Sequence, residues 1–199
     1  MVIILLLSIV SFAQKKTDYL VVKYDTSGKQ RFAYVFTNSK SDTITRLDTA
    51  KYFICFSDTI THFAIVGIKH QKGWWAIDKN ENPLFRVYNT SIGEPTPDVL
   101  REGLIRIVDE NDKIGFADYK GKIVIKPQFE IVSSFYKGRA IIGYDCKKEL
   151  WCCEGEYADK HYTTTCKQTG YINTKGQILY MGKKTFEEIQ KKIGWRQEY

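Results

Sequence analysis

Four short turn sequences recur along the chain, and they limit its fold more than any other feature. They are "DTSGKQ" (25–30), "DKNENP" (78–83), "DYKGKI" (118–123) and "NTKGQI" (173–178). Each begins with Asp or Asn, whose side chain hydrogen-bonds the backbone just ahead of it. Three of the four have Gly at the fourth position, where a positive φ carries no steric cost for glycine. The pattern predicts a tight hairpin turn at each place.

Strand-like sequences surround these turns. Upstream of three of them stand "WWAID", "IGFAD" and "TGYIN", and downstream stand "PLFRVY", "KIVIKPQF" and "QILYMG". A third apolar run follows a Gly in "EGLIRIV" (102–108) and in "KGRAIIG" (137–143), so Gly103 and Gly138 are 35 residues apart. The sequence therefore predicts a unit of three short antiparallel strands with a period of roughly 35–40 residues, in which each unit packs on the next.

The predicted fold class is all-β, with tandem three-stranded antiparallel β repeats. We expect an open curved array, with a barrel-like or propeller-like closure as the alternative. Of the 199 residues, 43% are hydrophobic, which suffices for one sizeable core. The expected organisation is a degenerate N-terminal β unit at 14–50, a repeat domain at 51–182 with an insertion at 145–167, and a C-terminal helical cap at 183–199.

The C-terminal segment has the period of a helix. Phe186, Ile189 and Ile193 are spaced i, i+3 and i+7, as on one face of an α-helix. Thr185 and Glu188 fit a capping box at its start. We expect a short amphipathic helix that covers the open edge of the last repeat, with a membrane-surface helix as the alternative.

The repeat resembles that of the bacterial WG-repeat family, whose unit runs roughly Trp-Gly-Tyr-Ile-Asp, a Gly-Lys turn, an apolar strand, Pro-x-aromatic-acid, then Phe and Gly-x-Ala. The stretch "GFADYKGKIVIKPQFEIVSSFYKGRAIIGY" (115–144) matches that unit almost throughout. The resemblance covers 51–182 well and 19–50 faintly. No copy keeps the Trp-Gly pair, since Trp74 is followed by Trp75. The resemblance implies an all-β repeat, often on exported proteins, and no common enzymatic activity.

The first residues predict export. "MVIILLLSIVSFAQ" carries no charge, and its apolar run is too short to span a bilayer. Ser11 and Ala13 place small residues at −3 and −1 of a cleavage site before Gln14. We expect a signal peptide at 1–13 and a secreted, periplasmic or cell-surface protein without a transmembrane span in the mature chain. A buried first strand is the alternative.

The charge pattern argues against a nucleic-acid partner. The net charge is +7, but basic and acidic residues are interleaved instead of gathered in one run. We therefore expect a solvated basic surface and, as partner, an envelope protein or glycan of unknown identity.

The last repeat carries an insertion of about 20 residues at 145–167, because Gly138 and Gly170 are 32 residues apart while Gly103 and Gly115 are 12 apart. Insertions into a repeat are where function is commonly added. The insertion holds four of the five cysteines, which are Cys146, Cys152, Cys153 and Cys166.

In an exported protein these cysteines predict two disulfides. A bond between the adjacent Cys152 and Cys153 would be strained, so we expect each of them to pair with Cys146 or Cys166 across a hairpin-like insertion. A zinc site from Cys152, Cys153, His161 and Cys166 is the alternative, but its spacing lacks the usual knuckle. We expect no metal and no cofactor, and we expect Cys55 to be a small buried residue.

The insertion also predicts a binding site. Trp151, Tyr157, His161 and Tyr162 could stack on a sugar or anchor a protein partner, or could pack against the insertion's own disulfides. No catalytic motif is present, and the chain has three His in all. The sequence predicts a non-enzymatic binding or scaffold module; a self-associating structural repeat protein and an envelope hydrolase are the alternatives.

Overall fold

The computed structural model describes residues 20–25, 33–38, 40, 42–48, 50–57, 59–60, 62–90, 96–152 and 161–197. Within them the chain forms strands β1 (Leu20–Asp25), β2 (Ala33–Thr37), β3 (Thr43–Arg46), β4 (Tyr52–Cys55), β5 (Thr59–Ile60), β6 (Ala64–Ile68), β7 (Trp74–Ile77), β8 (Pro83–Val87), β9 (Asn89–Thr90), β10 (Thr96–Pro97), β11 (Leu104–Val108), β12 (Ile114–Asp118), β13 (Ile123–Phe129), β14 (Ile131–Val132), β15 (Arg139–Cys152), β16 (His161–Asn173) and β17 (Ile178–Gly182). One helix, α1 (Phe186–Ile193), follows them. The predicted leader at 1–13 lies outside the described residues.

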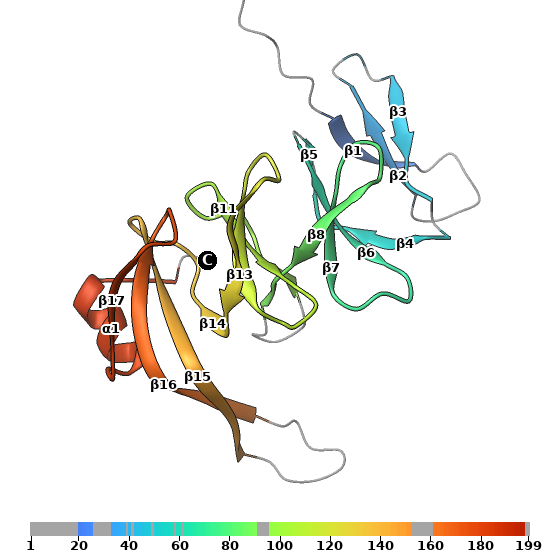
Figure 1. Cartoon of the computed structure of the whole chain (residues 1–199). Helices are drawn as coiled ribbons and strands as arrows, with labels where there is room; N and C mark the ends of the chain where they lie inside the picture. Colours follow the sequence, from blue (N-terminus) through green and yellow to red (C-terminus); the bar gives the residue numbers. More distant parts are fainter. Residues whose placement is uncertain are drawn as a thin grey trace, which may run out of the picture.

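The strands form open antiparallel sheets that follow one another in chain order, as Figure 1 shows. The N-terminal sheet has the order β3-β2-β1-β5, the central sheet has the order β13-β12-β11-β8-β7-β6-β4, and the C-terminal sheet has the order β14-β15-β16-β17. Strands β9 and β10 form a separate pair. The edges of the central sheet, β13 and β4, do not pair with each other. The predicted all-β fold is confirmed, and the array is open instead of closed.

Three meanders of the same kind make up the repeat region: β6-β7-β8, β11-β12-β13 and β15-β16-β17. The sequence predicts units that begin at the aromatic strands, which are β7, β12 and β16, whereas each observed meander begins one strand earlier. The cause is the pairing of β11, which aligns five residue pairs with β12 but two with β8. The strand after the Gly turn therefore belongs with the following aromatic strand.

The predicted Asp and Asn turns are confirmed at 78–83, 118–123 and 173–178. In each, Oδ1 of Asp78, Asp118 or Asn173 accepts hydrogen bonds from the backbone N–H groups two and four residues further on, at 2.8–3.0 Å. Asp109 makes the same two bonds at 2.8–2.9 Å in a turn that the pattern missed; Asp112 has the positive φ there, as Glu81 has in the turn at 78–83. The turn at 25–30 lies outside the described residues.

The Gly that precedes each third strand belongs to a two-residue hairpin turn. Glu102 and Gly103 have φ values of 51° and 77°, and Lys137 and Gly138 have φ values of 49° and 70°. Two successive positive φ angles define the turn type that matches the twist of a hairpin. The Gly138 N–H also donates to Oε2 of Glu102 at 2.8 Å, which ties one repeat to the next.

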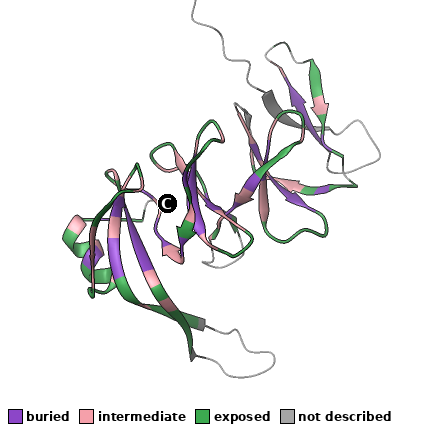
Figure 2. Cartoon of the chain, viewed as in Figure 1, coloured by how far each residue is buried: buried purple, intermediate pink, exposed green. Residues whose placement is uncertain are grey.

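The buried residues form four clusters, some of which span neighbouring sheets. One cluster joins Phe116, Ile125 and Phe129 of the central sheet to Ile142 and Ile172 of the C-terminal sheet. All five side chains are at most 3% exposed. Figure 2 shows the buried positions as stripes along the strands, with exposed residues at the turns. Burial of these stripes between successive meanders is how a repeat of short strands is stabilised.

The C-terminal helix forms where the sequence predicts it. Thr185 and Glu188 make both bonds of the capping box, and the helix ends at Gly194 with a left-handed C-cap. Ile189 is fully buried against Ile141 of β15. Helix α1 thus packs on the C-terminal sheet, as the capping interpretation expects. The described residues contain no helix with the length and apolar character needed to cross a bilayer.

Candidate functional site

The insertion at 145–167 is an extension of one hairpin. Strands β15 and β16 continue past the sheet as a two-stranded ribbon, here called the arm (residues 145–152 and 161–167), which projects from the body in Figure 1. Lys147 lies opposite Thr165 and Leu150 lies opposite Tyr162. The side chains of 147–150 and 162–165 are all exposed, as Figure 2 shows for this part of the ribbon. The prediction of a hairpin-like insertion is confirmed.

A disulfide between Cys146 and Cys166 holds the base of the arm. The predicted pairing of each of these cysteines with Cys152 or Cys153 is therefore wrong, because residues 146 and 166 are directly opposite each other in the ladder. The bond also removes Cys166 from the alternative zinc set. Because Cys146 and Cys166 are bonded to each other, neither is left for the second predicted disulfide. The side chain of Cys152 and the whole of Cys153 lie outside the described residues.

The predicted aromatic site is described only in part. Tyr162 is 46% exposed on the arm, with Nζ of Lys148 4.4 Å from the centre of its ring. Trp151 and His161 lie in β15 and β16, but their side chains are outside the described residues, as is Tyr157. Of these four side chains, Tyr162 is therefore the one that the structure describes. Cys55 is half-buried, packs against the first core cluster and donates from Sγ to the Ser57 carbonyl at 3.6 Å.

Glu130, which follows the repeat's aromatic residue, anchors the base of the arm. Its Oε2 accepts the backbone N–H of Cys146 at 2.7 Å, and its Oε1 accepts from Nζ of Lys113 at 3.3 Å. The bond from the Cys146 backbone and the nearby Lys113 charge hold the pKa of Glu130 below its ordinary value of 4.5. The ionised carboxylate thus links β12 and β13 to the disulfide.

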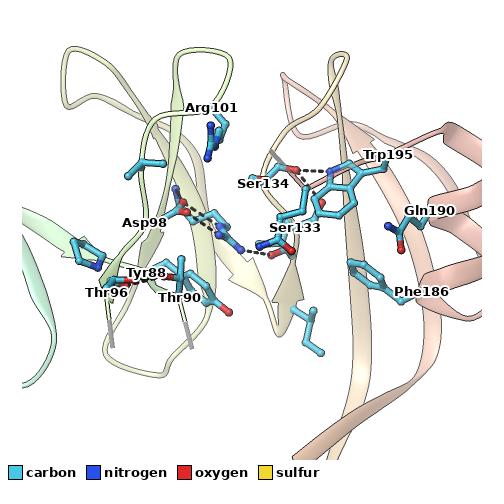
Figure 3. Close-up of a pocket in the computed structure, with 16 residues that line it drawn as sticks. Tyr88, Thr90, Thr96, Asp98, Arg101, Ser133, Ser134, Phe186, Gln190 and Trp195 are labelled. Atoms are coloured by element: carbon cyan, nitrogen blue, oxygen red, sulfur yellow. Dashed lines mark hydrogen bonds and ion pairs between the residues drawn. The ribbon is translucent and has the colours of Figure 1, made fainter. Parts of the chain in front are cut away.

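A cleft lies between the middle repeat and the C-terminal helix (Figure 3), with a volume of about 620 Å³. Tyr88, Thr90 and Asp98 stand on one side of it, and Phe186, Gln190 and Trp195 stand on the other. Ser133 and Ser134 form its floor between the two sheets. A cleft of this size is in the range of small-ligand sites.

A buried ion pair shapes one wall of the cleft. Nη2 and Nε of Arg106 donate to the two carboxylate oxygens of Asp98 at 2.7 and 3.0 Å, and the Arg106 backbone N–H donates to the same carboxylate at 2.9 Å. The side chains are 14% and 6% exposed. The Arg106 guanidinium also lies 4.3 Å from the centre of the Tyr88 ring, and Nη1 donates to the Val132 carbonyl at 3.2 Å. These contacts hold Asp98, Arg106 and Tyr88 in one orientation.

The opposite wall is fixed by the segment after α1. Nε1 of Trp195 donates to the Ser134 carbonyl at 2.9 Å, across 61 residues of sequence. Phe186 meets the Trp195 ring edge to face, with 6.2 Å between the ring centres. Gln190 lies on the same helix and points its amide into the cleft in Figure 3. Helix α1 and the segment after it thus cover the C-terminal sheet and also form this wall of the cleft.

The chemistry of this lining suits binding. Within the described ranges of the chain, its lining includes aromatic rings, hydroxyls, amides and two arginines, with Asp98 as the one carboxylate and no His or Cys. Among the described residues, three or more His, Cys, Asp or Glu side chains do not gather as a metal would require.

Comparison with known proteins supports the repeat. The family model described as WG containing repeat matches residues 114–145, which include β12, β13, β14 and the first half of β15. This match supports the repeat family predicted from the sequence, while a bacterial source stays a prediction. No curated protein and no solved structure matches the chain.

The cleft was missed at the sequence level for a physical reason. Its loop, "NTSIGEPTPDVL" (89–100), carries the Pro and Gly of an irregular segment, and nothing in it marks Asp98 as the partner of Arg106. The usable signal was Arg106, a charge in the otherwise apolar strand β11, although the loop before it offers two acids, Glu94 and Asp98. A charge inside an alternating apolar strand calls for a buried partner.

Proposed function

We propose that the protein is an exported, non-enzymatic binding module of the cell envelope that holds a segment of glycan in the cleft between its middle repeat and its C-terminal helix. The observation that carries the proposal is the cleft itself: aromatic rings on both walls, with hydrogen-bonding groups held in place between them. Sugars present apolar ring faces and many hydroxyls, so they fit a site with both kinds of surface.

The preorganised wall supports this proposal. Hydrogen bonds to Asp98 and Val132 engage three of the five guanidinium N–H groups of Arg106. The remaining two make no hydrogen bond to the part of the chain that the structure describes, and in the proposal they donate to a ligand oxygen. Because the ion pair already fixes the side chain, a ligand that accepts from Arg106 meets little cost in side-chain entropy. Gln190 adds a neutral donor and acceptor on the facing wall.

Export is supported by two independent features. The sequence of the first fourteen residues has the composition of a secretory signal, with cleavage expected between Ala13 and Gln14. The Cys146–Cys166 disulfide is the kind of bond that persists in oxidising compartments. A secreted, periplasmic or cell-surface location fits both.

Two substitutions on α1 test the site. Gln190→Trp puts a large ring into the cleft, while Lys191→Trp puts the same ring on an exposed position one residue further along the helix. Wild type and both variants are applied to an array of oligosaccharides and an array of peptides. We expect oligosaccharide binding that Gln190→Trp weakens by about tenfold or more and that Lys191→Trp leaves unchanged.

Two outcomes would contradict the proposal. Equal binding by wild type and Gln190→Trp would move the site out of the cleft. Capture of peptides alone would replace the glycan by a protein ligand. Circular dichroism of all three proteins shows whether each variant keeps the β-sheet fold.

A further inference from the structure

The arm leaves both of its edges unpaired. Within the described residues, β15 pairs with β14 only through Gly143 and Ile142, and β16 pairs with β17 only from Thr169 to Ile172. Beyond those positions the two strands have each other as their sole ladder partner. Unpaired backbone N–H and C=O groups along an extended strand form a ready template for another strand.

The ladder register shows which backbone groups face outward. The Cα atoms of Cys146 and Cys166 are 3.9 Å apart. This separation belongs to a non-hydrogen-bonded pair, since hydrogen-bonded antiparallel pairs lie about 5.5 Å apart. The pairs Lys148 with Thr164 and Leu150 with Tyr162 are two and four residues further on, so they are of the same kind. On β16, the N–H and C=O groups of Tyr162, Thr164 and Cys166 therefore point away from β15.

The two edges differ in how they are protected. Along β15 the arm reads Asp145-Cys-Lys-Lys-Glu149, so four of five residues are charged. Along β16 the opposite stretch reads Thr163-Thr-Thr-Cys-Lys167, and its one charge, Lys167, is paired with Asp145 at 2.7 Å. Charged residues on an edge prevent pairing with another chain, while a run of β-branched residues without charge favours it. The β16 edge is therefore the unprotected one.

We propose that the β16 edge of the arm pairs with the same edge of a second copy of this chain, antiparallel and about a two-fold axis at Thr164. In this register Thr164 lies opposite the partner's Thr164, and Tyr162 lies opposite the partner's Cys166. The outward groups of residues 162, 164 and 166 then form three hydrogen-bonded pairs across the axis. The two arms become one four-stranded sheet, an isologous and closed interface.

The side chains are compatible with this register. Opposed residues share a face of the sheet, so each Tyr162 ring comes beside the disulfide of the other copy, a favourable aromatic–sulfur contact. Lys148 and the partner's Lys148 are three strand spacings apart, about 14 Å. That distance exceeds a Debye length of about 8 Å at physiological salt, so their repulsion is screened. An edge whose one charge is already paired with Asp145 offers little to select a foreign sequence, whereas it fits its own copy.

Proline substitutions test the edge without breaking the arm. Thr164→Pro removes an N–H that points away from β15, so the ladder inside the arm keeps its bonds. Lys148→Pro makes the same change on the β15 edge and is the matched control. Thr164→Lys is a second variant, because it places like charges directly opposite each other at the axis. All proteins are expressed with their own leader, purified with the disulfide intact, and followed by sedimentation velocity from micromolar to submillimolar concentration.

We expect wild type and Lys148→Pro to form a dimer as concentration rises, while Thr164→Pro and Thr164→Lys remain monomers. A wild type that stays monomeric over the whole range overturns the proposal. So does a dimer that survives both Thr164 variants, or one that Lys148→Pro abolishes as well. If Thr164→Pro fails to form its disulfide, Thr164→Lys decides. The proposal does not depend on the cleft, since glycan binding and dimer formation are read by separate measurements.

Discussion

Gly115 is the position where a single methyl group should do most damage to the repeat. It lies in β12, where the neighbouring strand β13 is irregularly paired between Ile114 and Phe116. A Cβ atom there would lie 2.5 Å from the Pro127 nitrogen and 2.7 Å from the Lys126 carbonyl carbon, and it would also contact the Ile125 carbonyl oxygen. All three atoms are backbone, so β13 itself must move.

The cost of Gly115→Ala follows from that movement. Forcing extra volume into a close-packed site costs about 1–3 kcal/mol. Displacement of β13 also weakens the pairing of Ile114 with Phe129 and of Phe116 with Ile125, and each hydrogen bond lost there adds about 1 kcal/mol. We expect the free energy of unfolding to fall by about 3–5 kcal/mol, a large part of the usual total of about 5–15 kcal/mol.

Gly67→Ala is the matched control. Gly67 is also buried in a strand, and its Cβ would also lie too close to a neighbour, 2.6 Å from Cε1 of Phe53. Phe53 is 53% exposed, so its ring can swing into solvent. The loss of a strand glycine returns about 0.5–1 kcal/mol of backbone entropy, so we expect Gly67→Ala to lie within about 1 kcal/mol of wild type. Urea unfolding followed by circular dichroism measures both variants, and equal losses would refute the close-approach argument.

Three further predictions concern the ion pair, the disulfide and the arm base. Arg106→Ala leaves Asp98 buried without its partner and should lower the free energy of unfolding by about 3–5 kcal/mol, as measured by thermal unfolding. The double variant Arg106→Ala with Asp98→Ala should recover part of this loss, because it also removes the unpaired charge. Cys166→Ser removes a disulfide that spans 20 residues and should lower the free energy of unfolding by about 3 kcal/mol in the chain-entropy model. Hydrogen exchange should show lower protection in the arm and unchanged protection in the central sheet. The pKa of Glu130 is lowered on folding, so its contribution is complete above its unfolded pKa and is lost as pH falls through the lower folded value. The protection of the Cys146 amide against hydrogen exchange, measured relative to an unfolded chain at the same pH, should fall on acidification below pH 4.5 in wild type, and Glu130→Gln should remove that dependence.

Local chemistry was enough to predict the elements of the fold. The Asp and Asn turns, the Gly turns and the capped helix each depend on residues within a few positions of one another, as the bonds made by Asp118 and by Thr185 show. The same reasoning missed the Asp109 turn, although Asp112, its residue with positive φ, stands where Glu81 stands in the predicted turn at 78–83. Asp is one of the non-Gly residues that tolerate the left-handed region best.

Long-range contacts could not be derived in this way. The disulfide depends on the register of β15 and β16, which places Cys146 opposite Cys166, and one sequence permits several pairings. The cleft joins Asp98 and Arg106 to Trp195 through the folding of the helix onto the last sheet. None of these residues is close to Trp195 in sequence, and no short motif brings them together.

The most direct test of the cleft as the binding site uses the four tryptophan indole N–H signals in a ¹H–¹⁵N spectrum of the full chain. The Trp195 signal is assigned by its loss in Trp195→Phe, and the oligosaccharide selected on the array is then titrated in. We expect the Trp195 signal to shift until the site is saturated, while the signals of Trp74 and Trp75 stay in place. A bound oligosaccharide that leaves the Trp195 signal unmoved would contradict it.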